Sequence, residues 1–300
     1  MNSHLAFALR GVSTAVGNKF ALHDVSFELP TGYVMGLMGA NGAGKTTIIR
    51  CLLGMRQVDS GEIELLGHRV PGPVALRQDI GVVLDHAFLV GDWRLTEVER
   101  TLRPFYDRWD GACYRELLDE FGLDLRAKVK DLSRGMSMKL MIAAALSHRA
   151  RLLVFDEPTS GLDPVTRDEL VGIVGDFLID EGHSVLFSTH IASDLDRIGD
   201  YLTLIHDGRI VRTGTKDEVL EAYRVVRGGP DDLNEFVGVQ LIGVRRTSAG
   251  AQALVRTEEA GLLGGDVVVE APTLEEIAIH IGARVPRREP DSFMSTGRIA

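Results

Sequence analysis

One run of eight residues, Gly39-Ala40-Asn41-Gly42-Ala43-Gly44-Lys45-Thr46, constrains the fold of this chain more than any other feature. It follows an apolar segment predicted as a buried strand, 34–38, and precedes a predicted helix from about Lys45 to Leu53. Glycines let the backbone curl so that successive N–H groups point inward, and the helix adds its positive N-terminal end. An ordinary glycine-rich turn is the alternative, but a strand, loop and helix in this order favour phosphate binding. The run is therefore interpreted as a phosphate-binding loop.

This loop predicts contacts with a nucleotide. Lys45 is expected to reach the β- and γ-phosphates, and the Thr46 hydroxyl is placed to ligate Mg²⁺. The expected nucleotide-binding residues are Gly39, Asn41, Gly42, Ala43, Gly44, Lys45, Thr46 and Thr47.

A second apolar segment, 152–155, ends in Asp156 and Glu157. Open α/β sheets bind their ligands at the C-terminal ends of their strands, where these two carboxylates would lie. Asp156 suits the Mg²⁺ shell, and Glu157 is placed to polarise an attacking water as general base. An acidic pair alone could be a solvated turn, but the phosphate-binding loop elsewhere in the chain favours a catalytic role.

Three further motifs identify a family resemblance. Leu132-Ser133-Arg134-Gly135-Met136 resembles the signature sequence of ABC ATPases, Ser160-Gly161-Leu162-Asp163 their D-loop, and Ser188-Thr189-His190 their switch histidine. The motifs follow the family's order and lie within about residues 6–213. A generic phosphate-loop protein has no reason to carry all of them.

The resemblance implies that two subunits share each ATP site. Ser133 and Gly135, at the start of a predicted helix, would face the γ-phosphate held by the other subunit, and Asp163 would cross the interface. His190 would hydrogen-bond the γ-phosphate and act with Glu157 in catalysis, although a lone histidine after a strand is often a plain surface residue. The implied ligands are ATP and Mg²⁺, and the implied partner is a second ABC ATPase subunit, with a homodimer favoured.

The sequence departs from the family pattern at several positions. Arg134 and Met136 replace the usual glycine and glutamine of the signature. Asp85 stands where a glutamine normally follows the strand 80–84; it could still contact Mg²⁺ or its water shell, or be a plain turn residue. The aromatic that usually stacks on adenine is missing, with Val16 near its place and Phe20 as a substitute.

The expected fold class is α/β, a P-loop NTPase of ABC type. It would have a mostly parallel sheet, an N-terminal antiparallel β-subdomain and a helical subdomain. Residues 1–227 are assigned to the ATP-binding domain, with the helical subdomain at about 85–148. A helix capped by Thr215 and Glu218 is expected to run towards Val225.

A break at Gly228-Gly229-Pro230 predicts a boundary before a small C-terminal α+β unit, 231–283. Strands are expected at 236–242, 251–255 and 267–269, followed by a helix with Leu274, Ile277, Ala278 and Ile281 on one face. Residues 284–300 mix Arg, Pro, Asp and Ser, which predicts a disordered tail. Cover for the core is the default role of this unit, with regulator binding or an extended dimer interface as alternatives.

Composition restricts the partners. Asp and Glu outnumber Lys and Arg 43 to 33, a formal net charge of −10, so nucleic acid is not the expected partner. No apolar run reaches the roughly 18 residues that a bilayer span requires, and the N-terminus lacks a signal-peptide pattern. We therefore expect no direct membrane span, and a cytoplasmic protein held on the inner face of the membrane by permease subunits.

These observations favour an ATP-hydrolysing motor subunit that drives membrane permease subunits, most similar to bacterial ABC-2-type exporter ATPases. The alternative of a soluble ABC ATPase acting on nucleic acid or ribosomes lacks the usual second nucleotide domain or long coiled-coil insertion. A module that no longer hydrolyses ATP is disfavoured by intact Lys45, Asp156, Glu157 and His190; the departures at Asp85 and Arg134 keep it open.

Overall fold

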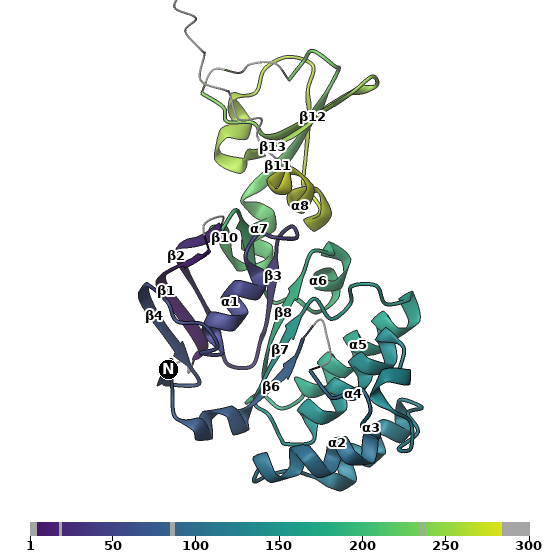
Figure 1. The fold of residues 1–300 in the computed structure, drawn as a ribbon. Coiled ribbons are helices and arrows are strands. Elements are labelled where there is room, and N and C mark those ends of the chain that lie inside the picture. Colours follow the sequence, from purple (N-terminus) through teal and green to yellow (C-terminus); the bar gives the residue numbers. More distant parts are fainter. Residues whose placement is uncertain (1–4, 18–19, 85–87, 234–235, 237, 284–300) are drawn as a thin grey trace, which may run out of the picture.

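The computed structural model describes residues 5–17, 20–84, 88–233, 236 and 238–283. These residues form three β-sheets. Figure 1 shows a larger lower body, with helices α2 to α5 gathered at one end, and a smaller C-terminal unit above it.

A six-stranded sheet in the order β10-β9-β3-β8-β7-β6 forms the centre of the larger body. The pairs from β6 across to β9 are parallel, and β10 is antiparallel to β9. Every residue of β3, β7 and β8 is buried, because packed elements cover both faces of the sheet. The predicted mostly parallel sheet is confirmed. Its strands are β3 (Val34–Met38), β6 (Ile80–Val83), β7 (Leu152–Asp156), β8 (Ser184–Thr189), β9 (Tyr201–His206) and β10 (Arg209–Thr215).

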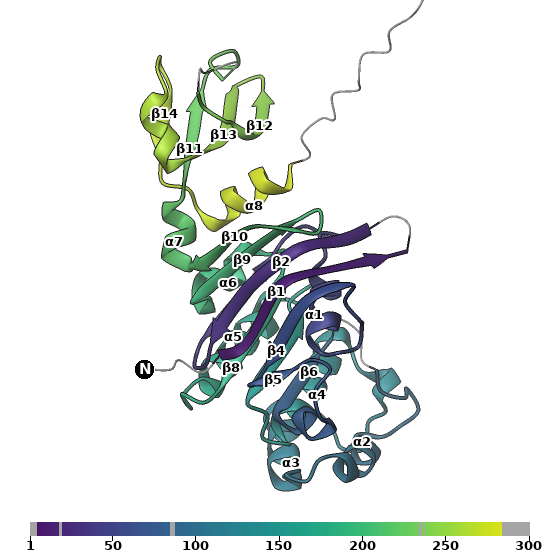
Figure 2. The same cartoon turned by 90° about the vertical axis from the view of Figure 1, so that its left-hand side faces the viewer.

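One face of this sheet packs on an antiparallel sheet with the order β2-β1-β4-β5 (Figure 2). Helix α1 contributes Ile48, Ile49 and Leu52 to the core between the two sheets. The predicted N-terminal antiparallel β-subdomain is confirmed, and β4 and β5 form a hairpin within it. The elements on this side are β1 (Leu5–Val16), β2 (Phe20–Pro30), α1 (Lys45–Leu52), β4 (Ser60–Leu65), β5 (His68–Arg69) and the 3₁₀ turn η1 (Val74–Asp79).

The other face packs on α4, α5 and α6. A separate core around Tyr114, Leu118 and Leu140 holds α2 and α3 against α4, so the helical segment between β6 and β7 has its own packing centre. The elements on this side are α2 (Leu95–Leu102), η2 (Arg103–Phe105), α3 (Gly111–Glu120), η3 (Val129–Asp131), α4 (Arg134–Leu146), α5 (Pro164–Phe177) and α6 (Ala192–Ile198).

The C-terminal unit is an antiparallel sheet of order β12-β13-β11-β14 with one flanking helix. Its strand β11 precedes the Gly228-Gly229-Pro230 break, so this sheet begins upstream of the predicted boundary. The helix expected to reach Val225 ends at Glu221, because Val225 and Val226 are buried in a strand that pairs on both edges. The elements are α7 (Lys216–Glu221), β11 (Tyr223–Gly228), β12 (Ile242–Thr247), β13 (Gly250–Arg256), η4 (Thr257–Leu262), β14 (Val268–Glu270) and α8 (Leu274–Gly282).

The prediction of a strand at 236–242 is wrong for the residues of this range that the structure describes. The strand is β12, and the apolar residues Val239 and Leu241 before it pack on the small core of the C-terminal unit without strand pairing. Apolar periodicity located the buried side chains correctly but not the hydrogen-bonded segment.

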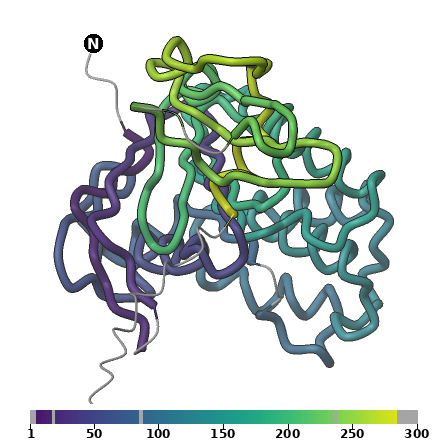
Figure 3. The backbone as a smooth tube through the Cα atoms, turned by 90° about the horizontal axis from the view of Figure 1, so that it is seen from above, coloured from purple at the N-terminus to yellow at the C-terminus, as the bar shows by residue number. Residues whose placement is uncertain are grey.

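Helix α8 connects the C-terminal unit to the larger body, which that unit overlies in Figure 3. Its Leu274 and Ile277 belong to the same core as Leu195 of α6 and Leu204 of β9. Ala278 and Ile281, the other two residues of the predicted apolar face, are half-buried against this core. Every helix in the described part of the chain is too short or too polar to span a bilayer.

Candidate nucleotide-binding site

The phosphate-binding loop joins the end of β3 to the start of α1. A Cβ at Gly39 would lie 2.4 Å from the carbonyl oxygen of Ile205, so no side chain fits there. Gly42 and Gly44 have φ values of 85° and 119°, in the left-handed region that other residues rarely adopt. These backbone demands explain the glycines and place the N-terminus of α1 at the loop.

The remaining loop residues differ in exposure. Asn41 and Thr46 are exposed and Thr47 is half-buried, whereas Ala43 is buried in the core beside α1. A hollow of about 330 Å³ opens over this loop. Val16 and Phe20 both line it, so the predicted substitute for the missing adenine-stacking aromatic, Phe20, lies at the site. Its lining residues are Val16, Phe20, Asn41, Gly42, Gly44, Lys45, Thr46, Thr47 and Glu157.

Lys45, Glu157 and His190 form a continuous polar chain although they are far apart in the sequence. Lys45 Nζ donates to the carbonyl oxygens of Gly39 and Ala40 at 2.6 and 3.1 Å and lies 2.9 Å from Glu157 Oε1. The other oxygen, Glu157 Oε2, accepts from His190 Nδ1 at 2.7 Å. The side chains of Lys45 and Glu157 are 5% and 14% exposed, so water screens this pair little.

Asp156 lies beside Thr46 at the end of β7. It accepts a hydrogen bond from the Thr46 hydroxyl, and Ser188 Oγ donates to its Oδ1 at 3.3 Å. Burial raises the pKa of Asp156, while the hydrogen bonds from Thr46 and Ser188 oppose that shift. Ser188 was not among the predicted site residues; the signal for it was a polar residue at the end of an apolar strand.

Neighbouring hydroxyl and carboxylate oxygens fit the preference of Mg²⁺ for oxygen ligands. The described residues contain no cluster of three or more histidine, cysteine or acidic side chains that would cage a metal by themselves. Mg²⁺ characteristically uses one or two protein ligands and completes its shell with phosphate oxygens and water. Thr46 and Asp156 therefore fit this ion. Asp85, the third predicted ligand, lies outside the described residues.

Comparison with known proteins identifies the family. The model of the ABC transporter family matches residues 22–160. A Nod factor export ATP-binding protein I from Rhizobium sp. (strain N33) is 31% identical, with 94% of this chain and 98% of that protein covered. This chain is an ABC transporter ATP-binding protein. A daunorubicin resistance ATP-binding protein from Streptomyces coeruleorubidus is 32% identical, with 92% of this ABC protein and 95% of that one covered.

Solved structures agree with this assignment. One described as the ATP-binding subunit of an ABC transporter has a TM-score of 0.65 and 30% identity, covering 71% of this chain and 91% of that one. CbiO1 from Clostridium perfringens shares the fold at a TM-score of 0.60 and 21% identity, over 72% of this chain and 90% of its own. The predictions of an ABC-type fold, ATP hydrolase activity and a transporter motor function are confirmed, and the nucleic-acid alternative has no support.

The residues of this ABC protein that were predicted as signature and D-loop lie away from the hollow. Ser133 caps α4 by accepting from Met136 N at 3.2 Å, and Asp163 caps α5 by accepting from Val165 N and Thr166 N. A Cβ at Gly135 would lie 3.3 Å from Thr166 Cγ2, so the starts of α4 and α5 adjoin each other. One chain thus brings Ser133, Gly135 and Asp163 together, but not with its own phosphate-binding loop.

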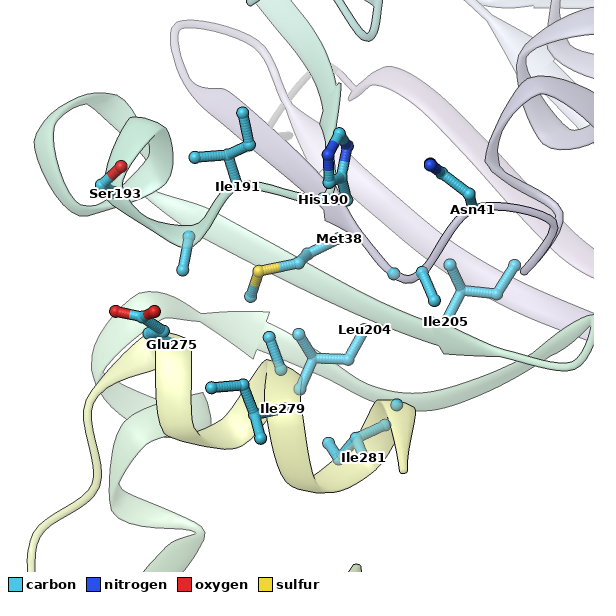
Figure 4. A pocket seen from close by; sticks show the side chains of 15 residues that line it. Met38, Asn41, His190, Ile191, Ser193, Leu204, Ile205, Glu275, Ile279 and Ile281 are labelled. Carbon is cyan, nitrogen blue, oxygen red and sulfur yellow. The ribbon is translucent and has the colours of Figure 1, made fainter. Parts of the chain in front are cut away.

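A larger cavity of about 480 Å³ lies between the ABC domain and α8. Figure 4 shows His190 and Asn41 on one side of it and Glu275, Ile279 and Ile281 of α8 on the other. The segment that follows His190 therefore faces α8 across a mainly apolar cavity. Motif reasoning missed this cavity because its walls come from four distant parts of the chain.

Proposed function

We propose that this protein binds Mg-ATP between two copies of the chain, hydrolyses it there, and drives membrane permease subunits of an exporter. The observation that carries the proposal is the chain Lys45–Glu157–His190, which brings a phosphate-binding cation, a candidate general base and a candidate γ-phosphate sensor into direct contact. The placement is peripheral, at the inner face of the membrane through the permease. Export is supported by the relatives, whose names describe Nod factor export and daunorubicin resistance.

Glu157 is proposed as the general base. Both of its oxygens face protein groups in this arrangement, one towards Lys45 and one towards His190. A phosphate competes with the carboxylate for the same two partners because both are anions. Binding of ATP would transfer Lys45 and His190 to the phosphates and free Glu157 to accept a proton from the attacking water. Mg²⁺, held by Thr46 and Asp156, would neutralise charge on the phosphate oxygens.

The second copy is proposed because one chain lacks half of the site. The described contacts place Ser133 and Gly135 at the start of α4, beside α5, rather than in the hollow. A helix N-terminus with a serine hydroxyl favours anions, so docking this end over the partner's ATP completes both sites by symmetry.

The test is light scattering of the purified Glu157→Gln variant with and without Mg-ATP. Binding with blocked hydrolysis should trap the dimer and raise the mass from 32.8 kDa to twice that value. Wild type should not accumulate the dimer, and Glu120→Gln, a matched change on the exposed side of α3, should behave as wild type. A Glu157→Gln chain that binds ATP yet stays monomeric would refute the two-copy site for the isolated protein.

A further inference from the structure

A buried polar network joins the two segments that carry Glu157 and His190. Its centre is Asp194 on α6, which is 2% exposed. Asp194 Oδ2 accepts from Thr159 Oγ1 at 2.6 Å and from Thr189 Oγ1 at 3.2 Å. Both threonines are fully buried, so these bonds lie in a low-dielectric interior where they are strong.

On one side the network holds the residues that flank His190. Thr189 Oγ1 accepts from the backbone N–H of Ile191 at 3.0 Å. A hydroxyl has a single proton, and Thr189 donates it to Asp194. The chain of bonds thus runs from Ile191 through Thr189 to the carboxylate, and it holds the backbone on both sides of His190.

On the other side the network holds the turn after Glu157. Ser160 N donates to the Glu157 carbonyl at 3.2 Å, and Leu162 N donates to the Thr159 carbonyl at 3.1 Å. Thr159 is therefore part of the turn that begins at Glu157, and its hydroxyl ties that turn to Asp194. One carboxylate oxygen connects both segments.

Within the described residues, the second carboxylate oxygen of Asp194, Oδ1, makes no hydrogen bond. Arg167 Nε of α5 lies 3.7 Å from Asp194 Oδ1, beyond hydrogen-bonding distance. Among the described residues, neither of these two buried atoms has a hydrogen-bond partner. A buried charge pair with imperfect bonding contributes little or nothing to folding stability. Stability alone does not explain a buried aspartate here, whereas the two threonine bonds give it a positional role.

We propose that Asp194 is a positioning residue for ATP hydrolysis, whose carboxylate fixes Glu157 relative to His190 through Thr159 and Thr189. It acts through these residues and contacts neither ATP nor the attacking water. The inference rests on the proposed roles of Glu157 and His190.

The first test compares Asp194→Asn with Asp196→Asn in the purified full chain. Asp196 lies two residues further along α6 and is exposed, so it controls for the loss of one charge. Asp194→Asn should lower kcat about 10- to 100-fold, as expected for small misplacements of catalytic groups, with the Kd for ATP within about twofold of wild type. A kcat within about twofold of wild type, or an equal loss in Asp196→Asn, would overturn the proposal.

The second test stays informative if Asp194→Asn fails to fold. Thr189→Val removes the hydroxyl at nearly constant volume, and Thr189→Ser keeps it. Thr189→Val should lose kcat while Thr189→Ser keeps most of it. Where Asp194→Asn folds, its combination with Thr189→Val should lose no more kcat than the worse single variant. Equal activity of the serine and valine variants would overturn the network.

Wild type and Glu157→Gln are measured in the same assay. Turnover by wild type that is lost in Glu157→Gln upholds the proposed function whatever Asp194 does, so failure of the network and failure of the general-base assignment are distinguishable.

Discussion

The ion pair between Lys45 and Glu157 should be strongly coupled because it is buried. Its atoms lie 2.9 Å apart with side chains 5% and 14% exposed. Lys45→Met would leave Glu157 charged and buried without its cation, and Glu157→Gln would leave Lys45 without its anion. We expect the cycle of Lys45→Met and Glu157→Gln to give a coupling energy of about 2 kcal/mol, within the range of contacting charged residues that water screens little.

The chain contains a matched control of nearly the same length. Arg69 lies 3.0 Å from Glu62, but these side chains are 75% and 59% exposed. The cycle of Arg69→Met and Glu62→Gln should therefore give only about 0.5 kcal/mol and lose it at high salt. Both cycles are measured by urea unfolding without nucleotide. Equal coupling in the two cycles would refute the argument that burial strengthens the Lys45–Glu157 pair.

The same pair predicts an effect on ATP affinity. If phosphate must displace Glu157 from Lys45, Glu157→Gln should bind ATP about tenfold more tightly, since about 1.4 kcal/mol of the coupling no longer opposes binding. Calorimetry at matched Mg²⁺ measures this change. Weaker ATP binding by Glu157→Gln would contradict the proposed exchange of Lys45 between carboxylate and phosphate.

The remaining predictions concern the signature serine, Mg²⁺ and two glycines. Ser133→Asp keeps a good N-cap but places a negative charge where the partner's phosphate would lie. Hydrolysis should therefore be lost while the unfolding midpoint stays unchanged. Retained turnover would contradict the composite site. Burial raises the pKa of Asp156 in the folded chain. Above this raised pKa the buried carboxylate is charged and lowers the free energy of unfolding. Below the ordinary aspartate pKa of the unfolded chain the residue is protonated in both states, and this destabilisation disappears. Asp156→Asn should abolish Mg²⁺-dependent hydrolysis because it removes a charged Mg²⁺ ligand. It should also raise Tm by about 2–4 °C at pH 7 because it removes the buried charge. Calorimetry should show this gain in Tm shrinking on acidification. Gly39→Ala should destabilise the fold by more than about 2 kcal/mol, because the Cβ meets a backbone oxygen. Gly172→Ala in α5 should instead stabilise the fold by about 0.5–1 kcal/mol, because nothing lies within 4 Å of its Cβ. Denaturant unfolding should show a lower free energy of unfolding than wild type for Gly39→Ala and a higher one for Gly172→Ala.

Short-range features of the site were predictable from sequence because their parts are consecutive residues. The loop 39–46 needs a strand before it, a helix after it and glycines within it, and all three are local. Asp156 and Glu157 follow an apolar strand for the same reason. The Gly228-Gly229-Pro230 break was equally visible, but it marks a turn inside the C-terminal unit, since a local signal cannot say which sheet will pair with β11.

The arrangement of the site depended on tertiary structure. Met38 is aligned with Thr189, and Asp156 with Ser188, across parallel strands, so the ends of β3, β8 and β7 meet at one edge. That register brings Lys45, Glu157 and His190 into contact, although the first two lie 112 positions apart in the sequence.

The Asp194 network was hidden for the same reason. A threonine after β7, another at the end of β8 and an aspartate on α6 carry no signal individually. Sequence determined which residue types could bind and cleave a phosphate. Only the packing of parallel strands and their helices decided which of those side chains meet, because hydrogen bonds act over about 3 Å whatever the separation along the chain.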